Sequence, residues 1–205
     1  MNVLITGASA GFGKALAERL VAKGHRVIGC ARRLEKLNAL AETLGENFLP
    51  VVMDVSDTDS IPHIIANLPD GFNQIDVLVN NAGLALGTEP AHKASLDDWM
   101  RMTDTNVKGL IALTHAVLPA MVNRDSGYII NVGSIAGNWP YFGGNVYGAT
   151  KAFVKQFSLN LRADLVGTQV RVTNIEPGVV AGTEFSNVRY HGDDDKAAKV
   201  YDGFK

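Results

Sequence analysis

The sequence predicts a single doubly wound α/β domain built on a parallel sheet of six strands. Short apolar runs alternate along the chain with segments whose apolar residues recur at helical spacing. The runs are apolar on both faces, as expected for parallel strands that helices cover on both sides. A hydrophobic fraction of 46% and a charged fraction of 20% are those of an ordinary globular domain of one core.

The elements follow one another in a regular order. The apolar runs expected to form strands are 2–6, 26–31, 48–55, 75–83, 127–134 and 170–178. The helical segments are 13–24, 34–45, 59–68, a long stretch that ends in 110–122, and 147–165. Ligands of such sheets bind beyond the carboxyl ends of the strands. The residues expected along that edge are 6–13, 31–33, 54–55, 80–83, 134 and 177–178.

The regular pattern stops after Pro177-Gly178. The segment that follows is polar, contains glycine and predicts no further strand, which is typical of a lid or a tail. We therefore expect residues 1–178 to form the regular part of the domain, and residues 179–205 to form an irregular segment of the same domain. The acidic run Asp193 to Asp195 is more simply a solvated turn than a cation site.

Composition argues against several classes of protein. A net charge of -2, without a basic run, gives no basis for nucleic-acid binding. No apolar stretch stands out as a membrane span, and the run from Val3 to Ile5 is too short for a signal peptide, so a cytoplasmic protein is expected. Cys30 is the only cysteine and is expected in the core, and the five histidines lack ligand spacing, so no metal site is predicted.

A glycine-rich loop joins the first predicted strand to the first helix. It does not match the nucleoside-triphosphate loop, because Gly7 is one residue too far from Gly13-Lys14 and Ala15 has no hydroxyl for magnesium. It also departs from the commonest dinucleotide spacing. Gly7 permits a tight turn, and Gly11 and Gly13 are expected to let the backbone approach a pyrophosphate at the helix N-terminus. A plain glycine-rich turn is the alternative.

Two arginines follow the second predicted strand, where NAD-preferring proteins place an acid that binds the ribose 2′-hydroxyl. Arg32 and Arg33 can instead hold a 2′-phosphate through charge-assisted hydrogen bonds. The alternative is that they merely flank the next helix, although its N-terminus does not favour cations. The sequence therefore predicts NADP as the cofactor.

A third group of residues indicates carbonyl chemistry. Tyr147 and Lys151 lie four apart in a helical segment, hence on one face, and Ser134 ends the preceding strand. A tyrosine with an ordinary pKa of about 10 needs a nearby positive charge to act as an acid and base at neutral pH, and we expect Lys151 to supply it. A serine hydroxyl can stabilise charge that develops on a carbonyl oxygen. A surface pair is the alternative for Tyr147 and Lys151 taken alone.

Together these motifs resemble the short-chain dehydrogenase/reductase family, over the chain from its first residue to about residue 182. The resemblance implies a Rossmann-type fold and an enzyme that transfers hydride between NADP(H) and an alcohol or carbonyl substrate. Residues 1–178 would then be the dinucleotide-binding and catalytic part, and residues 179–205 an irregular substrate lid of the same domain. The motifs that carry it are Thr6-Gly7-x-x-x-Gly11-x-Gly13, Asn80-Asn81-Ala82-Gly83, Ser134, Tyr147-x-x-x-Lys151 and Pro177-Gly178.

The resemblance also implies roles for single residues. Asn106 corresponds to an asparagine that holds a water in a proton relay to Lys151, and Asp54 to the acid that contacts the adenine. The implied catalytic residues are Asn106, Ser134, Tyr147 and Lys151. The implied cofactor-binding residues are Gly7, Ser9, Gly11, Phe12, Gly13, Arg32, Arg33, Asp54, Val55, Asn81, Ala82, Gly83, Tyr147, Lys151, Pro177 and Gly178.

Within that family, the runs around 80–95, 139–165 and 182–189 are similar to bacterial NADP-dependent 3-hydroxy acid dehydrogenases, the serine 3-dehydrogenase and malonic semialdehyde reductase type. The implied substrates are small 3-hydroxy acids such as serine, allo-threonine, 3-hydroxypropionate or 3-hydroxyisobutyrate, or their oxo forms. Such substrates need an anchor for the carboxylate near Tyr147. The polar candidates are Arg189, Asn145 and Tyr141, and a solvent-exposed lid residue is the alternative for Arg189.

The resemblance also shows what this chain does not contain. Members of the family continue beyond Lys205 with a helix and a seventh parallel strand, and they are commonly tetramers. We therefore expect an exposed edge on the sixth strand and a homo-oligomer whose interface is compromised by the short C-terminus. Two other functions stay open: a reductase of 3-oxoacyl thioesters or ketones, and an NADP-binding protein without turnover.

Overall fold

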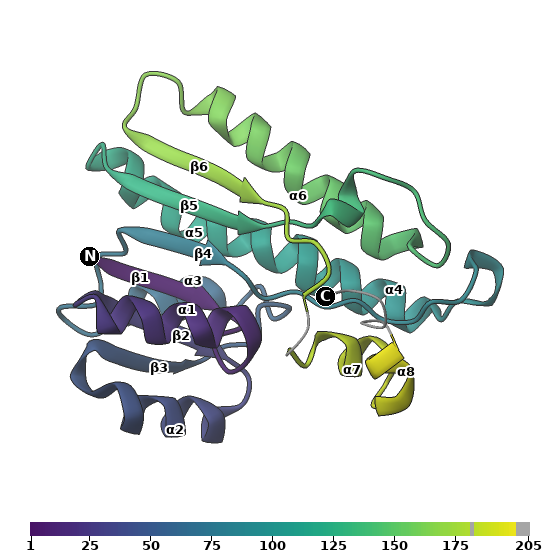
Figure 1. Cartoon of the computed structure of the whole chain (residues 1–205). Helices are drawn as coiled ribbons and strands as arrows, with labels where there is room; N and C mark the ends of the chain where they lie inside the picture. Colours follow the sequence, from purple (N-terminus) through teal and green to yellow (C-terminus); the bar gives the residue numbers. More distant parts are fainter. Residues whose placement is uncertain (181–182, 200–205) are drawn as a thin grey trace.

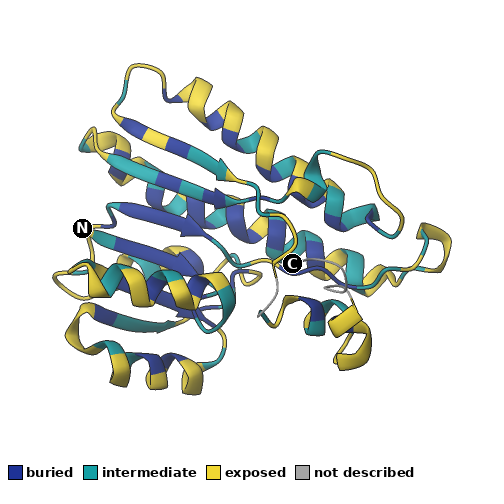
Figure 2. Cartoon of the chain, in the orientation of Figure 1, coloured by how far each residue is buried: buried dark blue, intermediate teal, exposed yellow. Residues whose placement is uncertain are grey.

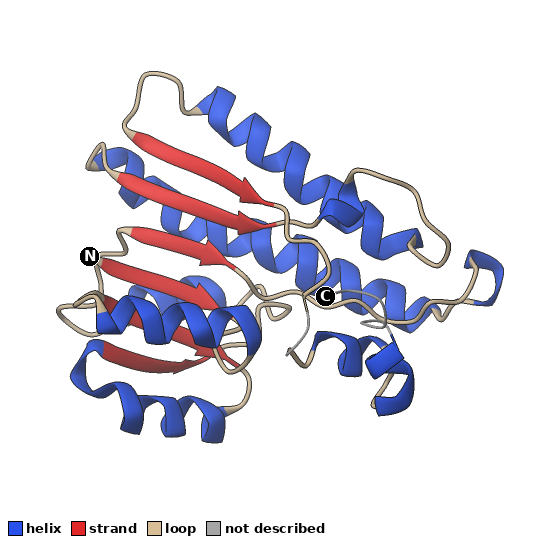
Figure 3. Ribbon diagram, viewed as in Figure 1, coloured by secondary structure: helices blue, strands red, loops and turns tan. Residues whose placement is uncertain are grey.

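The structure is a computed structural model of the chain that describes residues 1–180 and 183–199. It confirms a single Rossmann-like α/β domain with one parallel sheet of six strands, in the order β3-β2-β1-β4-β5-β6 (Figure 3). The strands are β1 Asn2–Thr6, β2 Arg26–Ala31, β3 Phe48–Val52, β4 Val77–Asn80, β5 Gly127–Val132 and β6 Val170–Ile175.

Helices connect the strands and cover the sheet (Figure 1). The helices are α1 Gly11–Ala22, α2 Leu34–Leu44, α3 Ile61–Ala66, α4 Leu96–Thr103, α5 Leu110–Asn123, α6 Asn145–Asp164, α7 Phe185–Arg189 and α8 Asp194–Lys199. Three short turns, η1 Gly45–Asn47, η2 Ala91–Lys93 and η4 Ile135–Gly137, are 3-10 helical, and η3 Asp104–Gly109 is a π-helical turn.

Two apolar cores lie on opposite faces of the sheet. One packs α1 and α2 against the strands, with Ala17 and Leu37 fully buried. The other packs α3, α5 and the C-terminal part of α6 against the second face, with Ile61 and Leu113 at its centre. In Figure 2 the strands β1, β2 and β4 between these cores are mostly dark blue, whereas β5 and β6 are partly teal or yellow. As predicted, Cys30 is a core residue, and burial raises the pKa of its thiol to about 12.

Helix α4, the π-helical turn and α5 form one continuous helical stretch, Leu96–Asn123. By length and composition alone this stretch could cross a membrane, contrary to the expectation that no apolar segment is long enough. In the fold, however, Leu113, Val117 and Met121 on α5 are buried against the sheet. Packing in the core therefore accounts for one face of the stretch, since 39% of its most apolar window is buried.

A chain of buried side-chain amides joins the middle of the sheet to α6. The Asn80 amide on β4 donates to Asn131 Oδ1 on β5 at 2.9 Å and to Thr114 Oγ1 on α5 at 3.1 Å. Asn131 in turn donates to Ser158 Oγ at 2.9 Å, and that hydroxyl donates to Val154 O. Because an unpaired polar group is costly in a core, this network fixes how α6 sits on the sheet.

The described part of the expected lid is more regular than predicted. Residues 179–205 were expected to be irregular, but the structure forms α7 and α8 there, beyond the carboxyl ends of the strands (Figure 1). Residues 181–182 and 200–205 of this expected lid lie outside the described residues. Asp194 and Asp195 fall in the first turn of α8, where the helix dipole favours acids.

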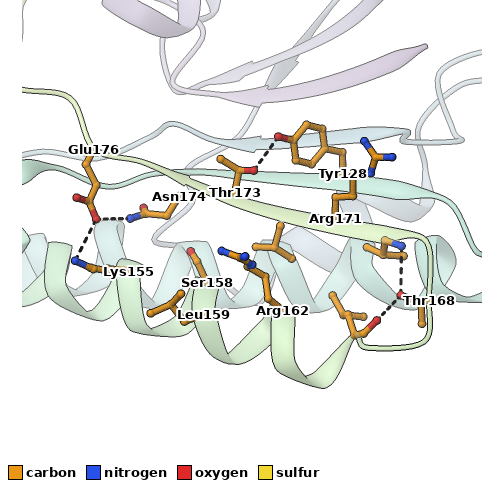
Figure 4. Close-up of a pocket in the computed structure, with 13 residues that line it drawn as sticks. Tyr128, Lys155, Ser158, Leu159, Arg162, Thr168, Arg171, Thr173, Asn174 and Glu176 are labelled. Atoms are coloured by element: carbon orange, nitrogen blue, oxygen red, sulfur yellow. Dashed lines mark hydrogen bonds and ion pairs between the residues drawn. The ribbon is translucent and has the colours of Figure 1, made fainter.

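Strand β6 lies at one edge of the sheet and has β5 as its neighbour. Beside it, a groove of about 630 Å³ runs between β6 and α6 (Figure 4). Lys155 and Arg162 from α6 line one side, and Thr173 and Asn174 from β6 line the other. The described residues thus leave the expected edge open, away from the carboxyl ends where the site lies.

Candidate active site

A cavity of about 630 Å³ opens at the carboxyl edge of the sheet. It is lined by the turns that follow β1 to β6, by the start of α6 and by α7. Most of the residues predicted from the sequence line it. These are Gly7, Ser9, Gly11, Phe12, Arg32, Arg33, Asp54, Val55, Asn81, Ala82, Gly83, Ser134, Tyr141, Tyr147, Lys151, Pro177, Gly178 and Arg189.

The glycine loop has the geometry that its sequence indicates, with one difference. Gly7 and Gly11 have φ values of 68° and 51°, which residues with a side chain rarely adopt. Gly13 does not line the cavity, and a Cβ there would lie 2.3 Å from the Gly7 carbonyl oxygen. Glycine is thus required at this position by the close packing of α1 on the turn, not by direct approach to a ligand.

Side chains from two strands hold this loop in place. Thr6 Oγ1 accepts hydrogen bonds from the amides of Asn81 at 3.0 Å and Ala82 at 2.9 Å. The Asn81 side chain donates to Thr6 O at 2.7 Å. The turns after β1 and β4 therefore form one rigid floor of the cavity.

The two arginines lie at the rim of the cavity, after β2. Arg33 Nη2 donates to Ser9 Oγ at 3.1 Å and to Glu184 Oε2 at 2.9 Å. Arg32 is more exposed, and its Nη1 lies 4.0 Å from Asp54 Oδ2. The guanidinium groups of Arg32 and Arg33 are thus held near the glycine loop and keep donors for a further anion.

Tyr147 and Ser134 meet at the opposite end of the cavity. Ser134 caps η4 by accepting from Ala136 N at 3.1 Å, and its hydroxyl is also hydrogen-bonded to Tyr147. Tyr147, on the first turn of α6, is only 7% exposed. Burial raises the pKa of Tyr147, and the hydrogen bond with Ser134 and the charge of Arg189 lower it by less.

Lys151 lies one turn further along α6 and is 6% exposed. Its Nζ donates to Val132 O at 2.8 Å and lies 5.9 Å from the centroid of the Tyr147 ring. Burial lowers the pKa of Lys151 to about 8. Burial is the largest effect on both side chains, because it lowers the pKa of the Lys151 ammonium and raises the pKa of the Tyr147 phenol. That the charge of Lys151 lowers the pKa of Tyr147 stays a prediction.

Asn106 is buried in the π-helical turn and does not itself line the cavity. Its amide nitrogen donates to Leu84 O at 2.9 Å and to Thr150 Oγ1 at 3.1 Å, and its oxygen accepts from Leu84 N at 2.9 Å. These bonds tie the turn after β4 to α6. Such π-helical turns are frequent at functional sites.

Two of the three residues suggested for the substrate lie in the cavity. Arg189 Cζ lies 5.8 Å from the ring centroids of both Tyr141 and Tyr147. Asn145 is different: its oxygen accepts from Trp99 Nε1 at 3.1 Å, its nitrogen donates to Glu89 O, and it does not line the cavity. As the first residue of α6, Asn145 holds the neighbouring segments instead of facing a ligand.

Other lining residues were not predicted from the sequence. Among them are Trp139 in the loop before α6, and Glu184 and Phe185 at the start of α7. The Phe185 ring lies 5.8 Å from the Tyr147 ring at 58°. Aromatic side chains in these loops are their one sequence signal, and this signal does not tell which way the loops fold.

No metal centre accompanies this cavity in the described ranges 1–180 and 183–199, where no three histidine, cysteine, aspartate or glutamate side chains are grouped closely enough to hold an ion.

Fold and site together define a dehydrogenase of the Rossmann type, with a dinucleotide cradle at one end and a Ser-Tyr-Lys group at the other. Comparison with known families agrees, since residues 1–193 match the short chain dehydrogenase family. The chain belongs to this family and is an oxidoreductase.

Individual relatives are similar over nearly the whole chain. The NADP-dependent 3-hydroxy acid dehydrogenase YdfG of Salmonella typhi is 64% identical over 98% of this chain and 82% of its own length. The serine 3-dehydrogenase of Agrobacterium fabrum is 52% identical over 98% of this chain and 80% of its own length. These relatives bear out the resemblance to 3-hydroxy acid dehydrogenases.

The most informative solved structure is described as the closed form of serine dehydrogenase complexed with NADP+. It superposes with a TM-score of 0.98 at 60% identity, and the match covers 100% of this chain and 83% of that one. Serine dehydrogenase from Escherichia coli matches with a TM-score of 0.87 at 55% identity, over 98% of this chain and 89% of that one. The predicted cofactor, NADP, agrees with these comparisons.

The buried ammonium of Lys151 leads to a prediction about stability. Because its pKa falls from an ordinary 10.5 to about 8, the unfolded chain binds more protons between these values, and wild-type stability rises with pH across that window. Below pH 8 the full penalty of burial applies. Lys151→Met should therefore stabilise the cofactor-free protein at pH 7 by up to about 3 kcal/mol, and the gain should fade toward pH 10.5.

Urea unfolding at a series of pH values measures this effect. Lys23→Met, at an exposed position that ends α1, is the matched control and should leave the pH dependence of stability unchanged. A Lys151→Met protein that is no more stable than wild type at pH 7 would contradict the prediction.

Proposed function

We propose that this protein transfers a hydride between NADP(H) and a small 3-hydroxy acid or its 3-oxo acid or semialdehyde. The observation that carries the proposal is the convergence of Ser134, Tyr147 and Arg189 in one cavity with the two arginines after β2. The names and identities of the relatives support the same reaction. The candidate substrates are serine, allo-threonine, 3-hydroxypropionate and 3-hydroxyisobutyrate.

The residues around the glycine loop fit the dinucleotide. Gly7 and Gly11 leave the backbone exposed in the cavity, at the N-terminus of α1 where an anion is favoured. Arg32 and Arg33 provide the donors for a 2′-phosphate. When bound, NADPH supplies the hydride.

At the other end of the cavity the protein handles the proton. The hydroxyls of Ser134 and Tyr147, hydrogen-bonded to each other, are placed to hold the carbonyl oxygen of the substrate between them. As hydride reaches the carbonyl carbon, Tyr147 donates its proton to the oxygen, and the reverse reaction returns it.

Lys151 and Asn106 act around this pair. Lys151 is placed to hold the ribose hydroxyls of the nicotinamide half and to favour the tyrosinate while it carries its own proton. Asn106 fixes the turn after β4 beside Lys151, and a Cβ on Gly83 would lie 3.3 Å from both side chains. This proximity supports the implied relay from Asn106 to Lys151.

The carboxylate of the substrate is assigned to Arg189. Its guanidinium lies over the rings of Tyr141 and Tyr147, and its Nε donates to Gly87 O at 3.3 Å. Within the described part of the chain this leaves both terminal nitrogens for a ligand. In this arrangement the residues after 178 form the lid. Other carbonyl substrates, such as 3-oxoacyl thioesters or ketones, would use the same catalytic residues but have no carboxylate that could pair with Arg189.

Assembly and location stay predictions. A homo-oligomer, a tetramer in the family pattern, is consistent with exposed apolar side chains on α4 and α5, such as Leu96, Met100 and Ile111. A cytoplasmic location rests on composition alone.

The first experiment tests whether Tyr147 drives turnover. We expect NADPH oxidation, followed by absorbance, with malonic semialdehyde as substrate, and little oxidation of NADH. Tyr147→Phe should lower kcat by about 10²- to 10⁴-fold because the proton donor is lost, while NADPH binding is kept. The control is Tyr128→Phe, whose hydroxyl contacts Thr173 outside the cavity. NADPH binding without turnover in the wild type would instead support the non-catalytic alternative.

A second experiment tests the arginines. Replacement of both Arg32 and Arg33 by glutamine should raise the KM for NADPH about tenfold or more, because charge-assisted bonds to the 2′-phosphate are lost, and change the KM for NADH little. Arg19→Gln, on the exposed side of α1, serves as the control. Equal changes in the KM for NADPH and for NADH would contradict the assignment of Arg32 and Arg33 to the 2′-phosphate.

A third experiment tests the carboxylate anchor. Arg189→Gln should lower kcat/KM for 3-hydroxy acids by about 10- to 100-fold, as expected for one charge-assisted bond, and spare uncharged alcohols. Arg171→Gln, on the exposed face of β6, is the matched control. Equal losses on charged and uncharged substrates would show that Arg189 has another role.

A further inference from the structure

Glu184 connects the lid to the cations at the rim of the cavity. Its Oε2 accepts from Arg33 Nη2 at 2.9 Å and its Oε1 accepts from Lys36 Nζ at 2.7 Å. The two cations come from the start of α2, about 150 residues earlier in the chain. One carboxylate is thus clamped by two cations that the sequence places far from it.

Glu184 directly precedes α7, the helix that lies against the catalytic tyrosine. The next residue, Phe185, packs on the Tyr147 ring, and Arg189 at the end of the helix lies 5.8 Å from the same ring. Any motion of Glu184 away from α2 would therefore carry both contacts with it.

The far end of α7 has its own anchors. The Gly87 amide donates to Arg189 O at 2.9 Å, and His191 Nε2 lies 3.1 Å from Asp98 Oδ2 on α4. Helix α7 is therefore tied to α2 at its start and to α4 at its end, and it spans the cavity between them.

The electrostatics favour an ionised Glu184 that shares Arg33 with a ligand. Its hydrogen bonds with Lys36 and then Arg33 lower the pKa of the Glu184 carboxyl, so the charge persists at neutral pH. Among the described residues, Arg33 donates to Ser9 and Glu184 through Nη2, which leaves Nη1 and Nε for a 2′-phosphate. Lys36 does not line the cavity, so its effect on the site passes through Glu184.

We propose that Glu184 is a positioning residue that holds the lid helix α7 over Tyr147 through its ion pairs with Arg33 and Lys36. This inference rests on the proposed function only for its kinetic consequence, since the clamp itself acts before any substrate binds. The cluster of Arg33, Lys36 and Glu184 beside the 2′-phosphate site would then also close the substrate end of the cavity.

The first test measures the lid without substrate. In Glu184→Gln, trypsin should cleave the cofactor-free protein after Arg189, Lys196 or Lys199 at least about threefold faster than in wild type. Exposed ion pairs of this kind shift the equilibrium between a docked and an open segment by small factors. Mass spectrometry identifies the bonds cut. Raised salt should speed the wild-type cleavage more than that of the variant, because the variant keeps, among the described residues, only the pair between His191 and Asp98 to hold α7. Because no substrate is present, this test decides the proposal even if no turnover is found.

The second test separates lid closure from cofactor binding. Glu184→Gln should raise the KM for malonic semialdehyde about threefold to tenfold, because the equilibrium constant for lid closure falls by the same factor. The Kd for NADPH should stay within about twofold of the wild-type value. Tighter NADPH binding with unchanged cleavage would mean that Glu184 competes with the 2′-phosphate, and it would overturn the proposal. Unchanged cleavage and KM would overturn it as well.

Two further variants complete the design. Lys36→Met should also speed lid cleavage, by less than Glu184→Gln, because it removes one of the two ion pairs of Glu184. The double variant should be no worse than Glu184→Gln alone, in which the pair with Lys36 is already lost. Glu18→Gln removes an exposed carboxylate that pairs with Lys14 on α1 and should change neither measurement. Additive effects of the Lys36 and Glu184 variants would show that the two residues act separately, contrary to the proposal.

Discussion

The parallel direction of all six strands is the constraint on which the rest of the structure depends. Because every strand pair is parallel, the carboxyl ends of all strands reach the same edge. Turns that are far apart in the chain therefore meet there, and short local bonds fix them. Thr6 and Asn81 join the turns after β1 and β4, and the buried Asn131 amide joins β5 to α6. The cradle and the catalytic end are in this way parts of one rigid frame.

The burial of Lys151 and Tyr147 in the cavity opposes the stability of the folded state. Lys151 is buried, with a backbone carbonyl as its hydrogen-bond partner, and burial lowers its pKa toward neutrality. Burial also raises the pKa of Tyr147. Lys151 thus loses its proton more easily, and Tyr147 holds its proton more firmly, than either does in water. This combination is suited to proton transfer, but burial of the Lys151 charge weakens the folded state. Such opposed demands are common where a site needs unfavourable electrostatics.

Much of the site follows from local sequence signals. The glycine loop, the arginines after β2 and the spacing of Tyr147 and Lys151 each belong to a short segment, and each was placed at the cavity by the strand it follows. Asn145 and Gly13, although predicted, do not line the cavity, for a different reason. Asn145 turns toward Trp99, and Gly13 is required by contact with the Gly7 carbonyl, so both depend on a neighbour that the local sequence does not show.

The sequence by itself determined the fold class and the family, and it predicted the dinucleotide loop and the candidate catalytic group, because periodicity and motif spacing are properties of contiguous residues. Only the tertiary structure decided how α7 lies over Tyr147, how Glu184 meets Arg33 and Lys36, and how strongly burial shifts the pKa of Lys151. Those features arise from contacts between segments separated by up to 151 residues and from the exclusion of water between them, and neither is encoded in any one segment.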